Sequence, residues 1–135
     1  MTPLDSAARP SALSLWAPVV AYMSLVFTLS AMSSPPSPVH VNDKIEHFVF
    51  YGGLALVALR ATAGGRLAGV TRGALVAAWA IASLYGATDE FHQWFVPGRS
   101  AELADWLADT LGAATAMGVA RQGAILLRSR RAARA

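Results

Sequence analysis

Apolar and polar positions follow one another along this chain in long blocks, and the blocks predict four helices. The apolar blocks cover approximately residues 13–32, 43–61, 73–92 and 103–127, and the connections between them contain proline or glycine. At a rise of 1.5 Å per residue, a helix of about 20 residues spans the roughly 30 Å hydrocarbon core of a bilayer. We therefore predict an all-α fold with a single domain over residues 1–135, an integral membrane bundle of four transmembrane helices.

The composition is typical of a membrane protein and excludes several other classes. Charged residues make up 14% of the chain and hydrophobic residues 55%, whereas soluble domains contain roughly 25% charged residues. The absence of cysteine excludes disulfides, thiolate metal sites and cysteine nucleophiles. The net charge of +3 arises from basic residues that flank apolar blocks and form no patch, so we predict no nucleic-acid binding.

Basic residues gather at one end of the predicted spans, and this sets the orientation. Nine of the eleven lie before the first span, between the second and third, or at the end of the chain: Arg9, Arg60, Arg66, Arg72, Arg121, Arg128, Arg130, Arg131 and Arg134. Positive residues next to spans stay in the cytoplasm, so we expect both termini there, in a multi-pass protein of the inner (cytoplasmic) membrane. The first apolar block exceeds the 7–15 residues of a signal-peptide core, which favours a span over a cleaved leader.

The outward end of the predicted bundle carries the polar groups of chemical interest. Residues 43–47 begin the second span, residues 89–93 end the third, and Asp105 and Asp109 begin the fourth. Asp109 and Arg121 are separated by about 16 Å of helix, so at least one lies below the membrane interface. Arginine reaches back to the interface on its long stem, whereas aspartate does not. We therefore expect Asp109 to face the bundle interior and to have a partner, because an unpaired charge at mid-membrane is costly.

Helical spacing groups several of these side chains on single faces. Asp43, His47 and Tyr51 recur at every fourth position, so one stripe of the second helix carries an acid, an imidazole and a phenol. On the fourth helix Gly112 follows Asp109 after one turn, and a glycine there admits a neighbouring helix. An imidazole beside a carboxylate is the usual acid or base near neutral pH. The spacing favours a binding or catalytic site at this end of the bundle.

Three ordered motifs in the chain resemble those of the VanZ-like family of small integral membrane proteins. They cover residues 43–51, 89–99 and 105–112. The resemblance implies a multi-span protein of the cell envelope, and the founding member of the family is associated with resistance to the glycopeptide antibiotic teicoplanin. The family pattern points to these positions: Asp43, Lys44, His47 and Tyr51; Asp89, Glu90, Gln93 and Arg99; and Asp105 with Asp109.

The first interpretation of these residues is an outward-facing polar pocket that binds the head group of an envelope lipid or cell-wall precursor. Lysine and arginine bind phosphate or carboxylate, and arginine does so through two parallel hydrogen bonds. The expected substrate-binding residues are Asp43, Lys44, Tyr51, Gln93, Arg99, Asp105 and Asp109. The candidate catalytic residues are His47, Asp89 and Glu90, and the sequence leaves open whether the protein is an enzyme. We interpret Glu46 and Glu102 as solvated residues.

Two alternatives stay open. One is a non-enzymatic membrane bundle or assembly factor whose polar core fixes helix packing. The other is a metal-dependent membrane hydrolase with His47, Asp89, Glu90 and Asp109 as ligands, because carboxylates with one imidazole suit Mg²⁺, Mn²⁺ or Zn²⁺. The chain has neither an HExxH motif nor a clustered histidine pair, so no metal ligand is assigned and the cofactor is unknown. The expected partner is a membrane lipid or cell-wall precursor, and an oligomer is compatible with the sequence.

Overall fold

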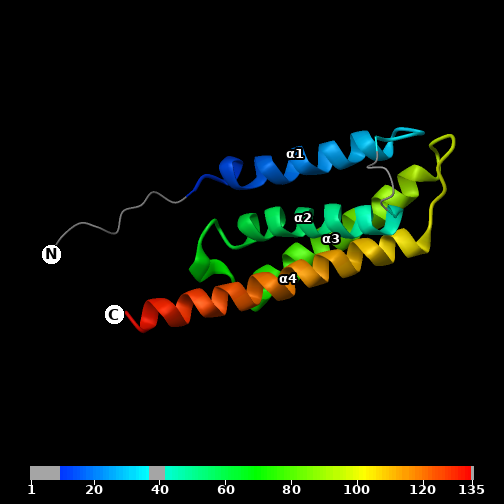
Figure 1. The fold of residues 1–135 in the computed structure, drawn as a ribbon. Helices are drawn as coiled ribbons and strands as arrows, with labels where there is room; N and C mark the ends of the chain where they lie inside the picture. Colours follow the sequence, from blue (N-terminus) through cyan, green and yellow to red (C-terminus); the bar gives the residue numbers. More distant parts are fainter. Residues whose placement is uncertain (1–9, 37–41, 135) are drawn as a thin grey trace.

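The computed structural model describes residues 10–36 and 42–134, which fold into long helices that run side by side (Figure 1). They are α1 (Ala12–Ser30), α2 (Asp43–Thr62), α3 (Arg72–Gln93) and α4 (Leu103–Ala132), with the short 3₁₀ helix η1 (Leu67–Gly69) between α2 and α3. The described residues contain no β-strand. The all-α fold expected from the sequence is thereby confirmed, while Arg9, used above for orientation, lies outside the described residues.

One described helix, α1, is long and apolar enough to cross a membrane when judged by length and composition alone. The other three long helices each carry at least three charged residues. By that measure, one of the four spans expected from the sequence is a clear candidate, and the other three are not confirmed. Each of the four apolar blocks nevertheless lies on one helix, and only α4 runs well past its block, which was predicted to end near residue 127.

The extension of α4 is held by a contact with the turn between α2 and α3. The Arg128 guanidinium donates to the carbonyl oxygens of Leu67 at 2.8 Å and Val70 at 2.9 Å. A charged donor forms strong hydrogen bonds to such carbonyl oxygens. This contact joins the end of α4 to the α2–α3 connection at one end of the bundle (Figure 1).

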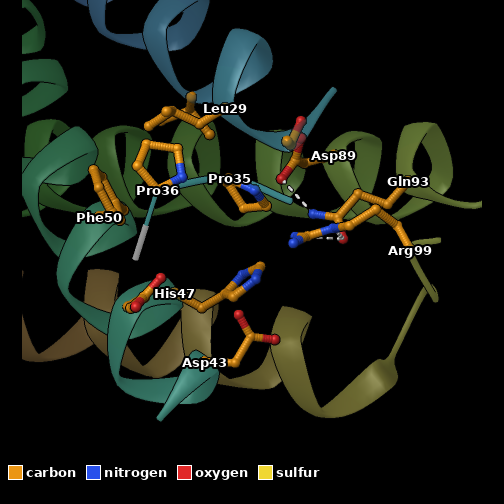
Figure 2. A pocket seen from close by; sticks show the side chains of 12 residues that line it. Leu29, Pro35, Pro36, Asp43, His47, Phe50, Asp89, Gln93 and Arg99 are labelled. Atoms are coloured by element: carbon orange, nitrogen blue, oxygen red, sulfur yellow. Dashed lines mark hydrogen bonds between the residues drawn. The ribbon is translucent and has the colours of Figure 1, made fainter. Parts of the chain in front are cut away.

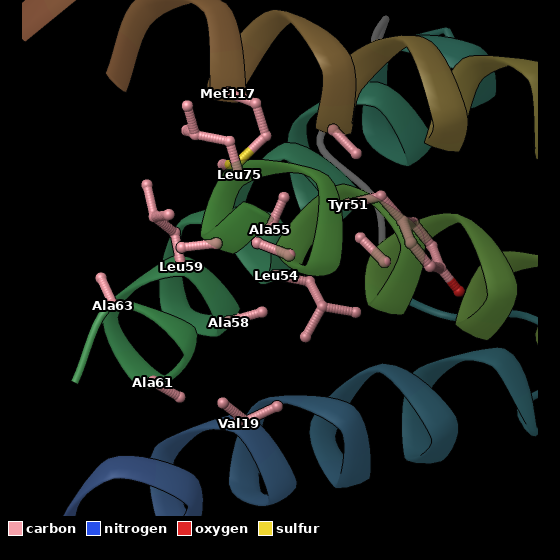
Figure 3. Packing of buried hydrophobic residues seen from close by; sticks show 14 of the residues in the cluster. Val19, Tyr51, Leu54, Ala55, Ala58, Leu59, Ala61, Ala63, Leu75 and Met117 are labelled. Atoms are coloured by element: carbon pink, nitrogen blue, oxygen red, sulfur yellow. The ribbon is translucent and has the colours of Figure 1, made fainter. Parts of the chain in front are cut away.

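Small residues let α2 pack closely against its neighbours. α2 contacts α1, α3 and α4, and the buried cluster between them contains many alanines (Figure 3). Ala55, Ala58, Ala78 and Ala113 are fully buried there. Without long side chains between them, the helix backbones approach one another, which is the packing mode that dominates where helices associate in lipid.

Two glycines bring α4 into direct contact with the backbones of α2 and α3. A side chain at Gly112 would collide with the Phe48 carbonyl group on α2, and a side chain at Gly86 on α3 would meet the Asp109 carboxylate. The close approach expected at Gly112 is confirmed. Asp109 is therefore held between α2 and α3, and this position determines the site described next.

Candidate functional site

The start of α2, the end of α3 and the start of α4 meet at one end of the bundle (Figure 1). Asn42 caps α2 by accepting the Lys44 N–H at 2.9 Å, which fixes where that helix begins. The acidic, imidazole and amide side chains buried at this end of the described chain are His47, Asp89, Glu90, Gln93, Asp105 and Asp109. Buried polar groups are costly unless they are paired or hydrogen-bonded, so their partners indicate what the arrangement does.

A cavity of about 70 Å³ opens between α1, α2 and the end of α3 (Figure 2). Its polar wall is formed by Ser30, Asp43, Glu46, His47, Asp89, Gln93 and Arg99. Its apolar wall comes from α1, from the segment after it and from α2: Val26, Leu29, Pro35, Pro36 and Phe50. The cavity thus combines charged and apolar surfaces in one small space.

Half of the sequence-predicted site residues line this cavity. Those that do are Asp43, His47, Asp89, Gln93 and Arg99. Those that do not are Lys44, Tyr51, Glu90, Asp105 and Asp109, which lie at the same end of the bundle outside the lining. The structure therefore divides the predicted set into residues that face the cavity and residues that lie beside it.

Arg99 is held at the cavity wall by a chain of hydrogen bonds along the end of α3 (Figure 2). Its Nε and Nη2 atoms donate to Gln93 Oε1 at 3.3 Å and 3.1 Å, and Gln93 Nε2 donates to Asp89 Oδ2 at 3.2 Å. Asp89 Oδ1 has no hydrogen-bond partner within the described part of the chain. Gln93 therefore orients the guanidinium while separating it from the carboxylate, so the Arg99 charge is not bonded directly to Asp89.

His47 forms the central pair of the site with Asp109. Its Nδ1 atom lies 2.9 Å from Asp109 Oδ1, and the Asp109 side chain is completely buried. The ring of Tyr51 lies parallel to that of His47, with 6.2 Å between the ring centroids. The expected stripe along α2 and the expected partner for Asp109 are both confirmed. When Nδ1 carries the proton that the carboxylate accepts, Nε2 keeps its lone pair.

Lys44 is engaged by two carboxylates of α4 and its N-terminal cap. Its Nζ atom lies 2.6 Å from Glu102 Oε2 and 2.7 Å from Asp105 Oδ1. The hydrogen bond from Lys44 lowers the pKa of the Glu102 carboxyl below its usual range. Lys44 does not line the cavity, so the geometry differs from the expectation that Lys44 and Arg99 flank one anion. Arg99 is the lining residue with a permanent positive charge.

Glu90 is fixed by the residue that caps α4. The Glu102 backbone N–H donates to Glu90 Oε2 at 2.8 Å, while Glu90 Oε1 has no hydrogen-bond partner among the described residues. Glu102 was interpreted from the sequence as a solvated residue, and its side chain is indeed about half exposed. Its contacts with Lys44 and Glu90 were missed, because both depend on how α4 is placed beside α2 and α3.

Among the described residues, two groups of side chains have the spacing of metal ligands. His47, Glu90 and Asp109 each offer one ligand atom within 4.8 Å of the others, and so do Asp43, His47 and Asp105. The four residues weighed from the sequence included Asp89, which belongs to neither group. Carboxylates with one imidazole form a donor set for divalent cations.

The comparisons with known proteins agree with the resemblance seen in the sequence. A family model described as VanZ/LLP1 matches residues 5–127, nearly the whole chain. No curated protein and no solved structure matches the chain. The matched range contains all three motifs and every residue that lines the cavity. This chain belongs to the VanZ/LLP1 family.

Proposed function

We propose that this protein spans the membrane four times with both termini in the cytoplasm, and that its outward-facing cavity binds the head group of an envelope lipid or cell-wall precursor. The observation that carries the proposal is the cavity itself. Arg99 offers a guanidinium at its polar wall, while Val26, Leu29 and Phe50 supply an apolar wall. A ligand that carries a charged group on an apolar chain matches both walls.

Exposed apolar side chains on every long helix support a lipid environment for all four. Val20 on α1, Leu56 on α2, Leu84 on α3 and Val119 on α4 are each exposed. Monomeric soluble proteins rarely expose large contiguous apolar patches to water. The charged residues that lower the hydropathy of α3 and α4 include buried groups of the site, Asp89 and Glu90 on α3 and Asp105 and Asp109 on α4, so those residues do not argue against contact with lipid.

The distribution of charge supports the proposed orientation. Arg60, Arg72 and Arg128 lie at the end of the bundle that carries the α2–α3 connection, where Arg128 bonds to the carbonyl groups of residues 67 and 70. The acidic residues of the described part of the chain and the cavity lie at the other end. Positive residues next to spans are retained in the cytoplasm, so the cavity faces outward.

The size and chemistry of the cavity narrow the ligand. One water molecule needs about 10–15 Å³ of cavity volume. A cavity of about 70 Å³ therefore holds about five water-sized groups, which is roughly the size of a phosphate group. Arg99 suits two oxygens of an anion. Asp43 and Asp89 accept hydrogen bonds from hydroxyl or ammonium groups. A head group with one anionic part and nearby donors fits this wall, and glycopeptide resistance in the family agrees with an envelope precursor.

The test is a binding measurement on the full chain purified in detergent. Farnesyl phosphate serves as the probe because it joins a phosphate to a short apolar chain. We expect Arg99→Lys to raise its Kd at least about tenfold, since lysine cannot form two parallel bonds to one anion. Arg121→Lys is the matched control, because Arg121 lies exposed on α4 away from the cavity. An unchanged Kd for Arg99→Lys contradicts the proposal.

A structural role is the second candidate, and the ion pairs between α2 and α4 favour it. His47 with Asp109 and Lys44 with Asp105 join the same two helices, and such pairs fix packing and register in some proteins. If the role is structural, substitutions at Arg99 lower thermal stability and cellular yield together. The protein that still folds then binds the probe as the wild type does. Loss of binding at unchanged stability distinguishes the pocket from the structural role.

A further inference from the structure

The buried charges around His47 do not balance within the described part of the chain. Four buried carboxylates lie here, on Asp89, Glu90, Asp105 and Asp109. Two permanently charged cations accompany them. Lys44 pairs with Asp105, and Arg99 is connected to Asp89 through the neutral Gln93 side chain. With His47 neutral and all four carboxylates ionised, these groups carry two more negative than positive charges. Uncompensated buried charge is strongly unfavourable, so protons on these groups or a bound cation must compensate it.

Three helices converge on the place where that charge is missing. His47 comes from α2, Glu90 from α3 and Asp109 from α4, and each offers one ligand atom within 4.8 Å of the other two. Metal–oxygen and metal–nitrogen bonds of about 2.0–2.2 Å bring the ligands of one ion to this kind of spacing. The three ligand atoms are therefore close enough together to bind a single ion.

Two of these side chains also have oxygen atoms without a partner. Glu90 Oε1 and Asp109 Oδ2 accept no hydrogen bond from any described residue, although both side chains are more than nine-tenths buried. Buried carboxylate oxygens normally have a donor or a cation beside them. These two atoms are an independent sign, separate from the clustering, that a positive partner belongs between α3 and α4.

We propose that His47, Glu90 and Asp109 bind a divalent cation of the Mn²⁺ or Zn²⁺ type beside the cavity. One imidazole with two carboxylates suits such borderline ions better than softer ones. The Glu102 N–H holds the second oxygen of Glu90, as outer contacts do at metal sites. The ion balances the two excess negative charges and fastens α2, α3 and α4 to one another.

The second cluster of possible ligands, formed by Asp43, His47 and Asp105, is the weaker candidate. Lys44 Nζ already lies 2.7 Å from Asp105 Oδ1, so a metal ion bound there would meet an ammonium group. Asp43 is exposed, so its carboxylate can be solvated without a bound cation. The Lys44 contact therefore directs a cation to the other side of His47, toward Glu90 and Asp109.

The proposed ion also adds a positive charge close to the cavity, because His47 lines that cavity. Binding of an anion near Arg99 would then be favoured further by the ion. The cation site does not depend on the proposed head-group function, since it rests on the three side chains alone. Measuring farnesyl phosphate binding with and without EDTA separates the two: binding that survives EDTA retains the head-group proposal whatever the metal result.

The experiment is metal binding by the full chain in detergent, stripped with chelator and dialysed. Mn²⁺ titration followed by electron paramagnetic resonance should give about one bound ion per chain, with Zn²⁺ competing for the same site. We expect Glu90→Gln to weaken Mn²⁺ binding at least about tenfold. The matched control Glu102→Gln keeps the backbone N–H that bonds to Glu90, and Asp43→Asn alters the other cluster; both should bind Mn²⁺ as the wild type does.

A measurement on the wild-type chain covers the case in which Glu90→Gln does not fold. Electron spin echo modulation should detect one imidazole nitrogen coupled to the bound Mn²⁺, and His47→Gln should remove it. Failure of the wild type to hold Mn²⁺ or Zn²⁺ at micromolar free metal overturns the proposal. Bound Mn²⁺ without nitrogen coupling overturns the proposal as well. Mn²⁺ binding that Glu90→Gln leaves intact also overturns it, and if Asp43→Asn abolishes that binding, the ion belongs to the other cluster.

Discussion

The contact between Gly86 and Asp109 gives the sharpest stability prediction. A Cβ atom at Gly86 would lie 2.5 Å from Asp109 Oδ2 and 3.1 Å from its Cγ, whereas unstrained carbon contacts are about 3.5–4.0 Å. In Gly86→Ala, either α3 and α4 separate or the Asp109 carboxylate turns away from His47. Overpacking costs about 1–3 kcal/mol, and a lost hydrogen bond to a charged group about 1.5–3 kcal/mol. Either response predicts a loss of about 2 kcal/mol.

The assay is reversible unfolding by SDS in mixed micelles, followed by circular dichroism, which yields the free energy of unfolding. Gly118→Ala is the matched control, because it is also a glycine inside a long helix and has nothing within 4 Å of its added Cβ. Alanine is favoured over glycine in helices by about 1 kcal/mol, so the control should be unchanged or more stable. A Gly86→Ala chain within about 0.5 kcal/mol of the control, the usual range of surface substitutions, would refute the α3–α4 contact.

Two further predictions concern the Lys44 network and the orientation. Lys44→Met should cost about 2–3 kcal/mol in the same unfolding assay, because it leaves the buried Asp105 carboxylate without its cation. Glu102→Gln should cost clearly less than Lys44→Met, since the Lys44–Glu102 pair is half exposed; equal losses from the two substitutions would contradict the importance of the Lys44–Asp105 pair. The chain has no cysteine, so an impermeant maleimide on intact cells should label Ser100→Cys and leave Ser129→Cys unlabelled until lysis. The reverse pattern would invert the orientation.

The helices and the burial of one key residue follow from the sequence by local rules. Spacing of four residues puts His47 and Tyr51 on one face of α2, and their parallel rings agree. The short distance along the helix from Asp109 to Arg121 predicts that Asp109 is buried, and it is completely so. Periodicity and helix length determine both outcomes, so no knowledge of the neighbouring helices is needed.

Pairings between helices do not follow from such rules. Lys44 and Glu102 are 58 residues apart, and nothing in either local sequence distinguishes their pairing from a contact of Lys44 with a ligand. The apolar wall of the cavity comes partly from Val26 and Leu29 on α1, a helix with no polar motif to mark it. Such contacts depend on the order and rotation of the helices, which glycines such as Gly86 and Gly112 set through close packing.

The central claim is that Arg99 binds the anionic head group inside the cavity, and a distance measurement tests it most directly. Chain labelled with ¹⁵N at arginine side chains is reconstituted in bilayers with farnesyl phosphate, and ³¹P–¹⁵N dipolar coupling is recorded by solid-state nuclear magnetic resonance. A bidentate contact predicts coupling between the phosphate and one guanidinium, and loss of that coupling in Arg99→Lys. Absence of coupling in the wild type, or coupling that persists in Arg99→Lys, would contradict the account.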